Sequence, residues 1–188
     1  MGETRLARAT DPRLQACGMG SCVGLCLYDA AARIAVLVHV VLPQLPPPSP
    51  LAARRLNHPA GKCADTAIPF ALGEIVRAGG SLGHVQAALV GGAQIFTGAG
   101  GDAAPSRLEI GTRNVLAVKE ELARQGIPIE AEDTGGRFGR TATLDPATGD
   151  VFVRPVGLGE RRLICLGRRS VPASPASPAK EGEYACGV

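Results

Sequence analysis

Cys22 is the residue whose type and setting in this chain most directly suggest chemistry. It ends the glycine-rich stretch "GMGSC" (residues 18–22) and opens an alternating apolar run, so a turn meets a strand there. Such a cysteine serves as a core residue, a metal ligand or a nucleophile. A nucleophilic cysteine needs a base, because the thiolate attacks and a free thiol is mostly protonated at neutral pH. His39, the first histidine of the chain, is the candidate base.

Two predicted strands have to bring Cys22 and His39 together. Residues 22–28 alternate along the chain, and residues 34–42 form a second run that is rich in β-branched side chains. If the connecting turn is centred on residues 30–31, Cys22 lies directly opposite His39, with Cβ atoms about 5 Å apart. A slip of one residue would place the two side chains on opposite faces. This register therefore predicts a Cys–His pair.

The glycine-rich stretch before Cys22 meets a second requirement of acyl chemistry. Backbone N–H groups at Gly20 and Ser21 are candidates for binding an oxyanion, while an imidazole takes the thiol proton and returns it to a leaving group. A structural cysteine is the alternative. The C-x4-C-x3-C spacing of Cys17, Cys22 and Cys26 matches no common zinc or iron–sulfur rule, so we predict no metal.

The rest of the chain mixes helices with strands that are partly linked as hairpins. We expect helices over residues 64–80 and 111–126, and strands over residues 84–92, 127–133, 141–156 (a hairpin) and 161–166. The fold class is therefore α/β (α+β) with a mixed sheet rather than a doubly wound parallel fold. No clear strand precedes Ala16. Pro69 fits its helix only if that helix starts near Asp65, so that the missing N–H falls in the first turn.

Two polar groups lie at the predicted helix starts. Lys62, Asp65 and Thr66 either cap their helix or line the site, because this segment follows the loop that leaves His39. Arg113 and Asn114 either bind substrate or cap the second helix, and the cap is the favoured interpretation.

Composition limits the classes of function. The chain has 188 residues, 45% of them hydrophobic, and a formal net charge of +3. Lysine and arginine do not cluster among aromatic residues, so we expect no nucleic-acid partner. No apolar run approaches the length of a membrane span and no signal-peptide pattern is present, so we expect a cytoplasmic protein with reduced thiols and no membrane insertion.

A series of short motifs, in order along the chain, resembles the chemoreceptor glutamine deamidase family CheD of bacterial chemotaxis. The motifs are "GSCVGLCLYD" (20–29), "HVVLP" (39–43), "GKCADTA" (61–67), "GGAQIF" (91–96), "IGTRN" (110–114), "GIPIEAEDTGG" (126–136) and "GR" (139–140). Each motif alone is weak, but together they cover most of the chain, from about residue 16 to residue 156.

The resemblance implies a specific activity and site. Members convert chosen glutamines of methyl-accepting chemotaxis receptors to glutamate, and some also hydrolyse receptor methyl esters. By motif, the nucleophile falls on Cys22 and the histidine on His39, with no cofactor. The family also binds a CheC-type phosphatase. Its fold is similar to that of toxin-type cysteine deamidases, with mixed β-sheets in a layered sandwich and flanking helices. We accordingly expect one deamidase-like domain over 1–166, with a proline-rich loop at 44–61, and a low-complexity tail over 167–188.

One position departs from the pattern of the family. The family usually has a threonine six residues before the nucleophile, as the third member of the catalytic set, and this chain has Ala16 there. An alanine cannot orient an imidazole by hydrogen bonding, so reduced activity is one expectation. The alternative function is a weakened or inactive homologue that acts as a receptor-binding or phosphatase-binding module.

Overall fold

The computed structural model describes residues 2–44, 62–94 and 110–167. The predicted proline-rich loop and C-terminal tail lie almost entirely outside these ranges. The described chain forms two helices, a short 3-10 turn and nine strands. In chain order they are β1 (Thr4–Arg8), β2 (Leu14–Met19), β3 (Val23–Asp29), β4 (Ile34–Val40), α1 (Ala64–Arg77), η2 (Leu82–His84), β5 (Val85–Gly91), α2 (Ile110–Arg124), β6 (Ile129–Thr134), β7 (Arg140–Leu144), β8 (Asp150–Pro155) and β9 (Arg161–Cys165).

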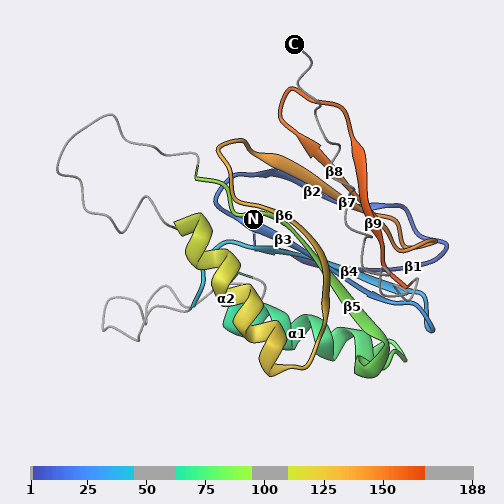
Figure 1. Cartoon of the computed structure of the whole chain (residues 1–188). Helices are drawn as coiled ribbons and strands as arrows, with labels where there is room; N and C mark the ends of the chain where they lie inside the picture. Colours follow the sequence, from blue (N-terminus) through green and yellow to red (C-terminus); the bar gives the residue numbers. More distant parts are fainter. Residues whose placement is uncertain (1, 45–61, 95–109, 168–188) are drawn as a thin grey trace, which may run out of the picture.

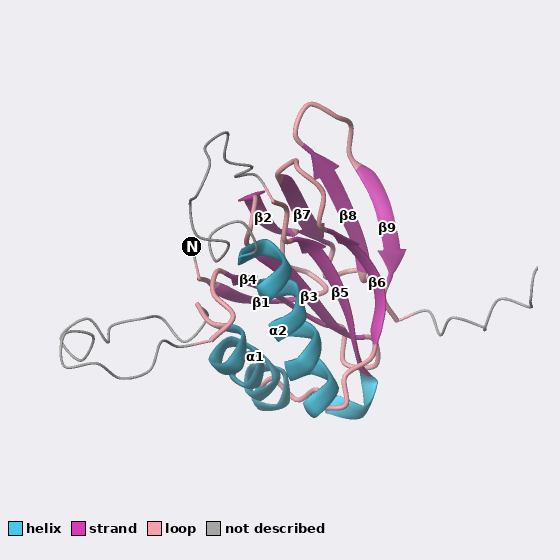
Figure 2. Cartoon of the chain, turned by 60° about the vertical axis from the view of Figure 1, so that its left-hand side comes forward, coloured by secondary structure: helices cyan, strands magenta, loops and turns pink. Residues whose placement is uncertain are grey.

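The strands form two sheets that pack in layers. Sheet A has the order β1-β4-β3-β5-β6, with β5 and β6 parallel, and sheet B has the order β2-β7-β8-β9. Helices α1 and α2 cover one face of sheet A, and sheet B covers the other (Figure 1; Figure 2). The predicted α+β class, with mixed sheets in a layered sandwich and flanking helices, is confirmed.

The central strand β3 shows why this sequence forms a three-layer structure. Val23, Leu25 and Leu27 belong to the core under the helices, whereas Cys26 and Tyr28 belong to the core between the sheets. All seven residues of β3 are buried, as expected for a strand that is covered on both faces. The predicted alternation of this run is confirmed.

The predicted register of β3 against β4 is wrong by two residues. Gly24, not Cys22, lies opposite His39, and the last pair before the turn is Asp29 with Ile34. The turn is longer than expected because the Asp29 carboxylate accepts the N–H groups of residues 31 and 32, at 2.9 and 3.0 Å. Because side chains alternate with a period of two, a shift of two residues leaves each side chain of β3 on its predicted face, with Cys22 one residue beyond the paired strand.

The expectation that no strand precedes Ala16 is also wrong. Strand β1 pairs with β4 at the edge of sheet A, and β2, which carries Ala16, pairs with β7 at the edge of sheet B. Strand β1 contains Arg5 and Arg8 and is short, as is typical of edge strands. The two edge strands form the side of the molecule where the site lies.

Helix α1 starts at Ala64 and contains Pro69 in its interior. We expected Pro69 in the first turn, but it lies in the second turn. Because proline has no N–H, the helical hydrogen bond from residue 69 to the Asp65 carbonyl is missing. The proline side chain is exposed, so the ring meets no packed neighbour there. Neither helix in the described ranges is long and apolar enough to cross a bilayer.

Candidate functional site

A cavity of about 210 Å³ opens between the two sheets, beside the edge strands β1 and β2. It brings together His39 from β4 and Ala16 from β2, two positions singled out in the sequence. The lining residues are Glu3, Arg5, Gln15, Ala16, Cys17, Leu37 and His39. The imidazole therefore faces an open space, with charged groups on the side of β1.

The electrostatic setting of His39 favours its neutral form. Its backbone N–H donates to the Glu3 carbonyl at 2.9 Å, and its half-buried side chain follows Leu37 on the face turned to sheet B. Burial lowers the pKa of His39, and the Glu3 carboxylate partly opposes this by favouring the imidazolium. Among the described residues, Nε2 is enclosed without a hydrogen-bond partner. One ring nitrogen of a neutral imidazole carries no proton, so His39 in this form can accept one.

Cys22 lies one residue before β3, at the same end of the molecule as His39. The N–H of Gly92 donates to the Cys22 carbonyl at 2.7 Å, which extends the pairing of β3 with β5 by one residue. The pairing of β3 with β4 begins at Val23 with Val40, so Cys22 lies just beyond the paired residues, and it is not among the residues that line the cavity beside His39. Burial raises the pKa of the Cys22 thiol. The resting pair is therefore a neutral thiol near a neutral imidazole.

The segment of residues 20–22 is held by its carbonyl groups. The three carbonyls accept, in chain order, from the N–H of Ala93 at 2.7 Å, from Nδ2 of Asn114 at 2.8 Å and from the N–H of Gly92 at 2.7 Å. Within the part of the chain that the structure describes, none of the three N–H groups of this segment donates to a protein acceptor. Fixed and unpaired N–H groups next to a nucleophile are what an oxyanion site requires.

Two glycines allow the backbone to pack closely around this segment. A Cβ on Gly91, whose φ is +112°, would lie 2.4 Å from the Cys22 carbonyl oxygen. A Cβ on Gly24 would lie 2.5 Å from Sδ of Met19, a side chain that is fully buried over β3. A larger residue at Gly91 would displace the nucleophile segment, and one at Gly24 would displace the Met19 side chain.

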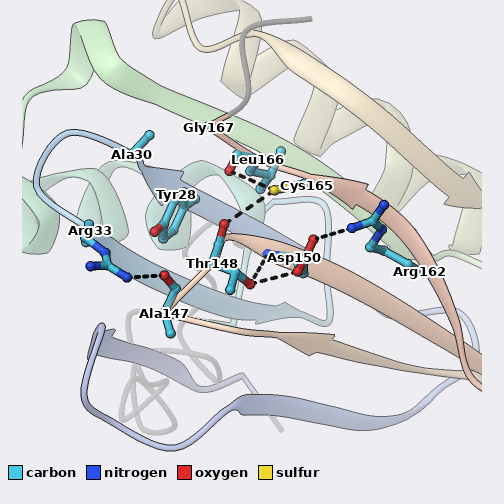
Figure 3. A pocket seen from close by; sticks show the side chains of 10 residues that line it. All are labelled: Tyr28, Ala30, Arg33, Ala147, Thr148, Asp150, Arg162, Cys165, Leu166 and Gly167. Atoms are coloured by element: carbon cyan, nitrogen blue, oxygen red, sulfur yellow. Dashed lines mark hydrogen bonds and ion pairs between the residues drawn. The ribbon is translucent and has the colours of Figure 1, made fainter.

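A larger cavity, of about 340 Å³, lies at the far end of β3 beside Tyr28. Figure 3 shows that its polar side chains bond to neighbours within the cavity wall. Arg33 donates to the Ala147 carbonyl, Arg162 pairs with Asp150 at 3.2 Å, and the Cys165 thiol contacts the Thr148 carbonyl at 3.4 Å. Among the residues that the structure describes, these groups bond to one another, and no histidine lines this cavity.

Comparison with known proteins places this geometry in a family. The model of the family described as "CheD chemotactic sensory transduction" matches residues 45–155. The chain is 43% identical to a protein of Symbiobacterium thermophilum over 163 residues, 87% of this chain and 94% of that protein. It is 38% identical to a protein of Syntrophomonas wolfei, over 86% of this chain and 94% of that protein. A protein of Pyrococcus abyssi is 43% identical over 74% of this chain and 79% of its own length.

The chain belongs to the CheD family. Each of these three relatives carries the name "Probable chemoreceptor glutamine deamidase CheD". The resemblance drawn from the motifs is confirmed. The range matched by the CheD model begins after Cys22 and His39, so the assignment of these two residues depends on the motif "GSC", on the motif "HVVLP" and on the geometry above.

The start of α1 holds the chain that follows His39 in this CheD protein. The N–H groups of Val41 and Leu42 both donate to the Lys62 carbonyl, at 3.0 and 3.1 Å. Thr66 Oγ1 contacts the Cys63 carbonyl at 3.2 Å, and Asp65 lies in the first turn of the helix. Asp65 and Thr66 are not among the residues that line the cavity beside His39. Their predicted site-lining role stays a prediction.

The prediction that Asn114 caps the second helix is wrong. Helix α2 begins at Ile110, so Asn114 lies in its second turn, where it is fully buried and bonds to the Ser21 and Val41 carbonyls. A signal for this was present in the sequence. Asn114 precedes Val118 by four residues, so a polar amide lies on the apolar face of the helix.

The other cysteines of the 17–26 stretch point away from a shared site. Cys17 is exposed on β2 and contacts Gln15 Oε1 at 3.3 Å, whereas Cys26 is buried between the sheets. Burial raises the pKa of the Cys26 thiol to about 12, so it stays protonated and inert. In the described ranges, no group of three or more His, Cys, Asp or Glu side chains is arranged to hold a metal ion.

Proposed function

We propose that this chain is a protein-glutamine deamidase that converts glutamine side chains of chemoreceptors to glutamate, with Cys22 as nucleophile and His39 as general acid and base. The observation that carries the proposal is the segment of residues 20–22. It places a thiol and unpaired backbone N–H groups at the end of β3 where β3 pairs with the segment of β4 that carries His39. The names of its relatives in the CheD family supply the class of substrate.

The neutral resting pair defines the first half of the reaction. His39 accepts the proton of the Cys22 thiol as sulfur attacks the carboxamide carbon of the substrate glutamine. The negative charge that develops on the amide oxygen is stabilised by N–H groups of residues 20–22. The imidazolium then donates its proton to the departing nitrogen, so that ammonia leaves and a thioester remains.

The second half restores the enzyme. His39 accepts a proton from water, the resulting hydroxide attacks the thioester carbon, and the thiolate leaves as the product carboxylic acid forms. The imidazolium returns its proton to Cys22 and the acid gives its proton to ammonia, so that glutamine and water have become glutamate and ammonium. The same steps on a glutamyl methyl ester release methanol, and we include receptor methylesterase activity in the proposal.

The direct test uses a purified chemoreceptor as substrate. Incubation with this protein should convert specific receptor glutamines to glutamate, as mapped by peptide mass spectrometry against a reaction without enzyme. A receptor carrying glutamyl methyl esters should release methanol in the same assay. If the receptor is bound but neither glutamine conversion nor methanol release occurs, the result supports the alternative of a receptor-binding or phosphatase-binding module. A cytoplasmic location and a CheC-type phosphatase partner remain part of the same proposal.

Ala16 is expected to limit the rate of this reaction. It lines the cavity with His39 and occupies the position where the family usually has threonine, while Nε2 of His39 has no partner among the described residues. We predict that Ala16→Thr raises kcat about 10-fold, because a hydroxyl there can orient the imidazole. Ala16→Val adds similar volume without the hydroxyl and is the matched control. Equal rates for both variants would contradict this role.

Glu3 is expected to tune the acid side of the pH profile. Its carboxylate favours the charged form of His39, so removal of that charge lowers the pKa of His39 further. We predict that Glu3→Gln moves the acid limb of kcat/KM to lower pH and leaves the plateau rate within about twofold, which is the scale of an exposed charge. A shift of that limb to higher pH would contradict the assignment of the limb to His39.

A further inference from the structure

We propose that Asn114 is a positioning residue of this deamidase. Its side-chain amide directs the Cys22 N–H toward the oxyanion and ties the nucleophile segment to the chain that follows His39. The inference rests on the proposed function, because it assigns a further part of the same site. Asn114 itself is not expected to touch the substrate, since it is completely buried.

The contacts of Asn114 join three parts of the chain that are distant in sequence. From helix α2, its Nδ2 donates to the Ser21 carbonyl at 2.8 Å and to the Val41 carbonyl at 3.0 Å. Ser21 directly precedes Cys22, and Val41 lies two residues after His39. Both acceptors are carbonyls, so the nitrogen of the amide must face them and the orientation of the side chain is determined.

The planarity of the peptide bond converts this contact into control of an N–H group. In a trans peptide, the carbonyl of one residue and the N–H of the next point in opposite directions. By holding the Ser21 carbonyl on the helix side, Asn114 therefore turns the Cys22 N–H away from α2. The Ala93 N–H does the same for the preceding peptide, because it binds the Gly20 carbonyl at 2.7 Å.

Helix α2 is placed so that Asn114 reaches both carbonyls. Gly111 lies one turn earlier on the same face and packs directly on the backbone after β5. A Cβ on Gly111 would lie 2.5 Å from the Gly92 carbonyl oxygen and 2.8 Å from that of Ala93. Val41 is also held from its other side, since its N–H donates to the Lys62 carbonyl. The amide thus bridges two segments that are each fixed independently.

An asparagine is the residue that this bridge requires. Its NH2 group offers two donors from one planar centre, which matches two carbonyl acceptors. Aspartate has the same shape but would place an acceptor oxygen against both carbonyls. Leucine has a similar volume and no donor. N114D and N114L therefore remove the bridge in different ways while they keep the space filled.

The test compares the steady-state rates of N114D and N114L with those of the wild-type enzyme on a purified chemoreceptor. We expect kcat to fall about 100-fold, the scale of losing one oxyanion donor, with KM changed less than about threefold. The rate of Cys22 alkylation by iodoacetamide should change less than about twofold, since displacement at that reagent builds no oxyanion. A kcat within about threefold of wild type in either folded variant would overturn the proposal.

The control variant is D29N, which changes a second fully buried polar residue, located in sheet A rather than in α2. Asp29 accepts three backbone N–H groups at the opposite end of β3, at 2.8–3.0 Å. We expect D29N to lower the melting temperature but to keep kcat within about twofold, whereas the asparagine variants lower kcat at temperatures where they are fully folded. An equal loss of kcat in D29N would show that Asn114 acts through stability alone.

One further variant separates this inference from the proposed function. If Cys22→Ala retains full activity, the catalytic assignment on which the inference rests is wrong. If Cys22→Ala is inactive and both asparagine variants keep their kcat, the inference alone fails. Should N114L not fold, N114D, which preserves the shape of the side chain, decides the question.

Discussion

Replacement of Cys22 by alanine is expected to abolish deamidation of a chemoreceptor, with kcat lowered about 10⁴-fold or more. The size follows from the mechanism, because no thioester can form without the sulfur and the remaining site only binds the substrate and stabilises charge. Receptor binding should persist, because Cys22→Ala removes only the sulfur atom from a segment whose three backbone carbonyls are held by hydrogen bonds. Glutamine conversion by mass spectrometry and receptor binding by calorimetry measure the two effects separately.

The matched control for Cys22→Ala is Cys165→Ala. Cys165 is also a partly exposed cysteine at the end of a strand, β9, but it lies in the larger cavity at the far end of β3. Its replacement should leave kcat within about twofold of wild type, as is usual for substitutions away from a site. Comparable activity of the Cys22→Ala and wild-type enzymes, under conditions where both bind receptor, would refute the assignment of Cys22 as the nucleophile.

Alkylation of the free enzyme adds information on the state of the thiol. Because burial raises the pKa of Cys22, iodoacetamide should modify it at neutral pH no faster than an ordinary thiol. Cys26, with a pKa of about 12 and no exposed surface, should react only after unfolding. Fast modification of Cys22 at pH 7 would instead indicate a thiolate–imidazolium pair at rest.

The strands and helices that carry the site follow from simple patterns in the sequence. The alternation of β3 is strong because both faces of the strand are buried, and the apolar periodicity of α2 is strong because one face meets sheet A. Strand β1 lacks such a signal. As an edge strand with exposed Arg5 and Arg8, it shows no continuous apolar pattern, and its pairing with β4 is a tertiary property.

The details of the site depend on contacts that no local pattern encodes. A shift of two residues keeps every side chain on its face, so the hydrophobic pattern cannot distinguish Gly24 from Cys22 as the partner of His39. The loop length that decides it is set by the Asp29 carboxylate binding two N–H groups. The bridge from Asn114 to Ser21 spans 93 residues and becomes visible only once α2 is packed.

The second large effect is expected for His39→Gln, which should lower kcat by about 10³-fold, within the range for loss of a general acid and base. Glutamine retains polarity and similar size but cannot accept the thiol proton. His84→Gln is the matched control, because His84 is exposed at the far end of β3 beside Asp29. That variant should retain the wild-type rate and pH profile.

The pH profile of the wild-type enzyme tests the neutral pair directly. The reaction needs an unprotonated imidazole, and burial lowers the pKa of His39, so the acid limb of kcat/KM should lie below the ordinary histidine value of about 6.5. It also needs a protonated thiol to supply the proton for ammonia, and burial raises the pKa of Cys22, so the basic limb should lie above the ordinary cysteine value. The expected result is a plateau wider than either group would give in water. An acid limb above pH 7 in the wild-type enzyme would contradict His39 as the base, because partial burial of its imidazole lowers the pKa of His39 below its ordinary value.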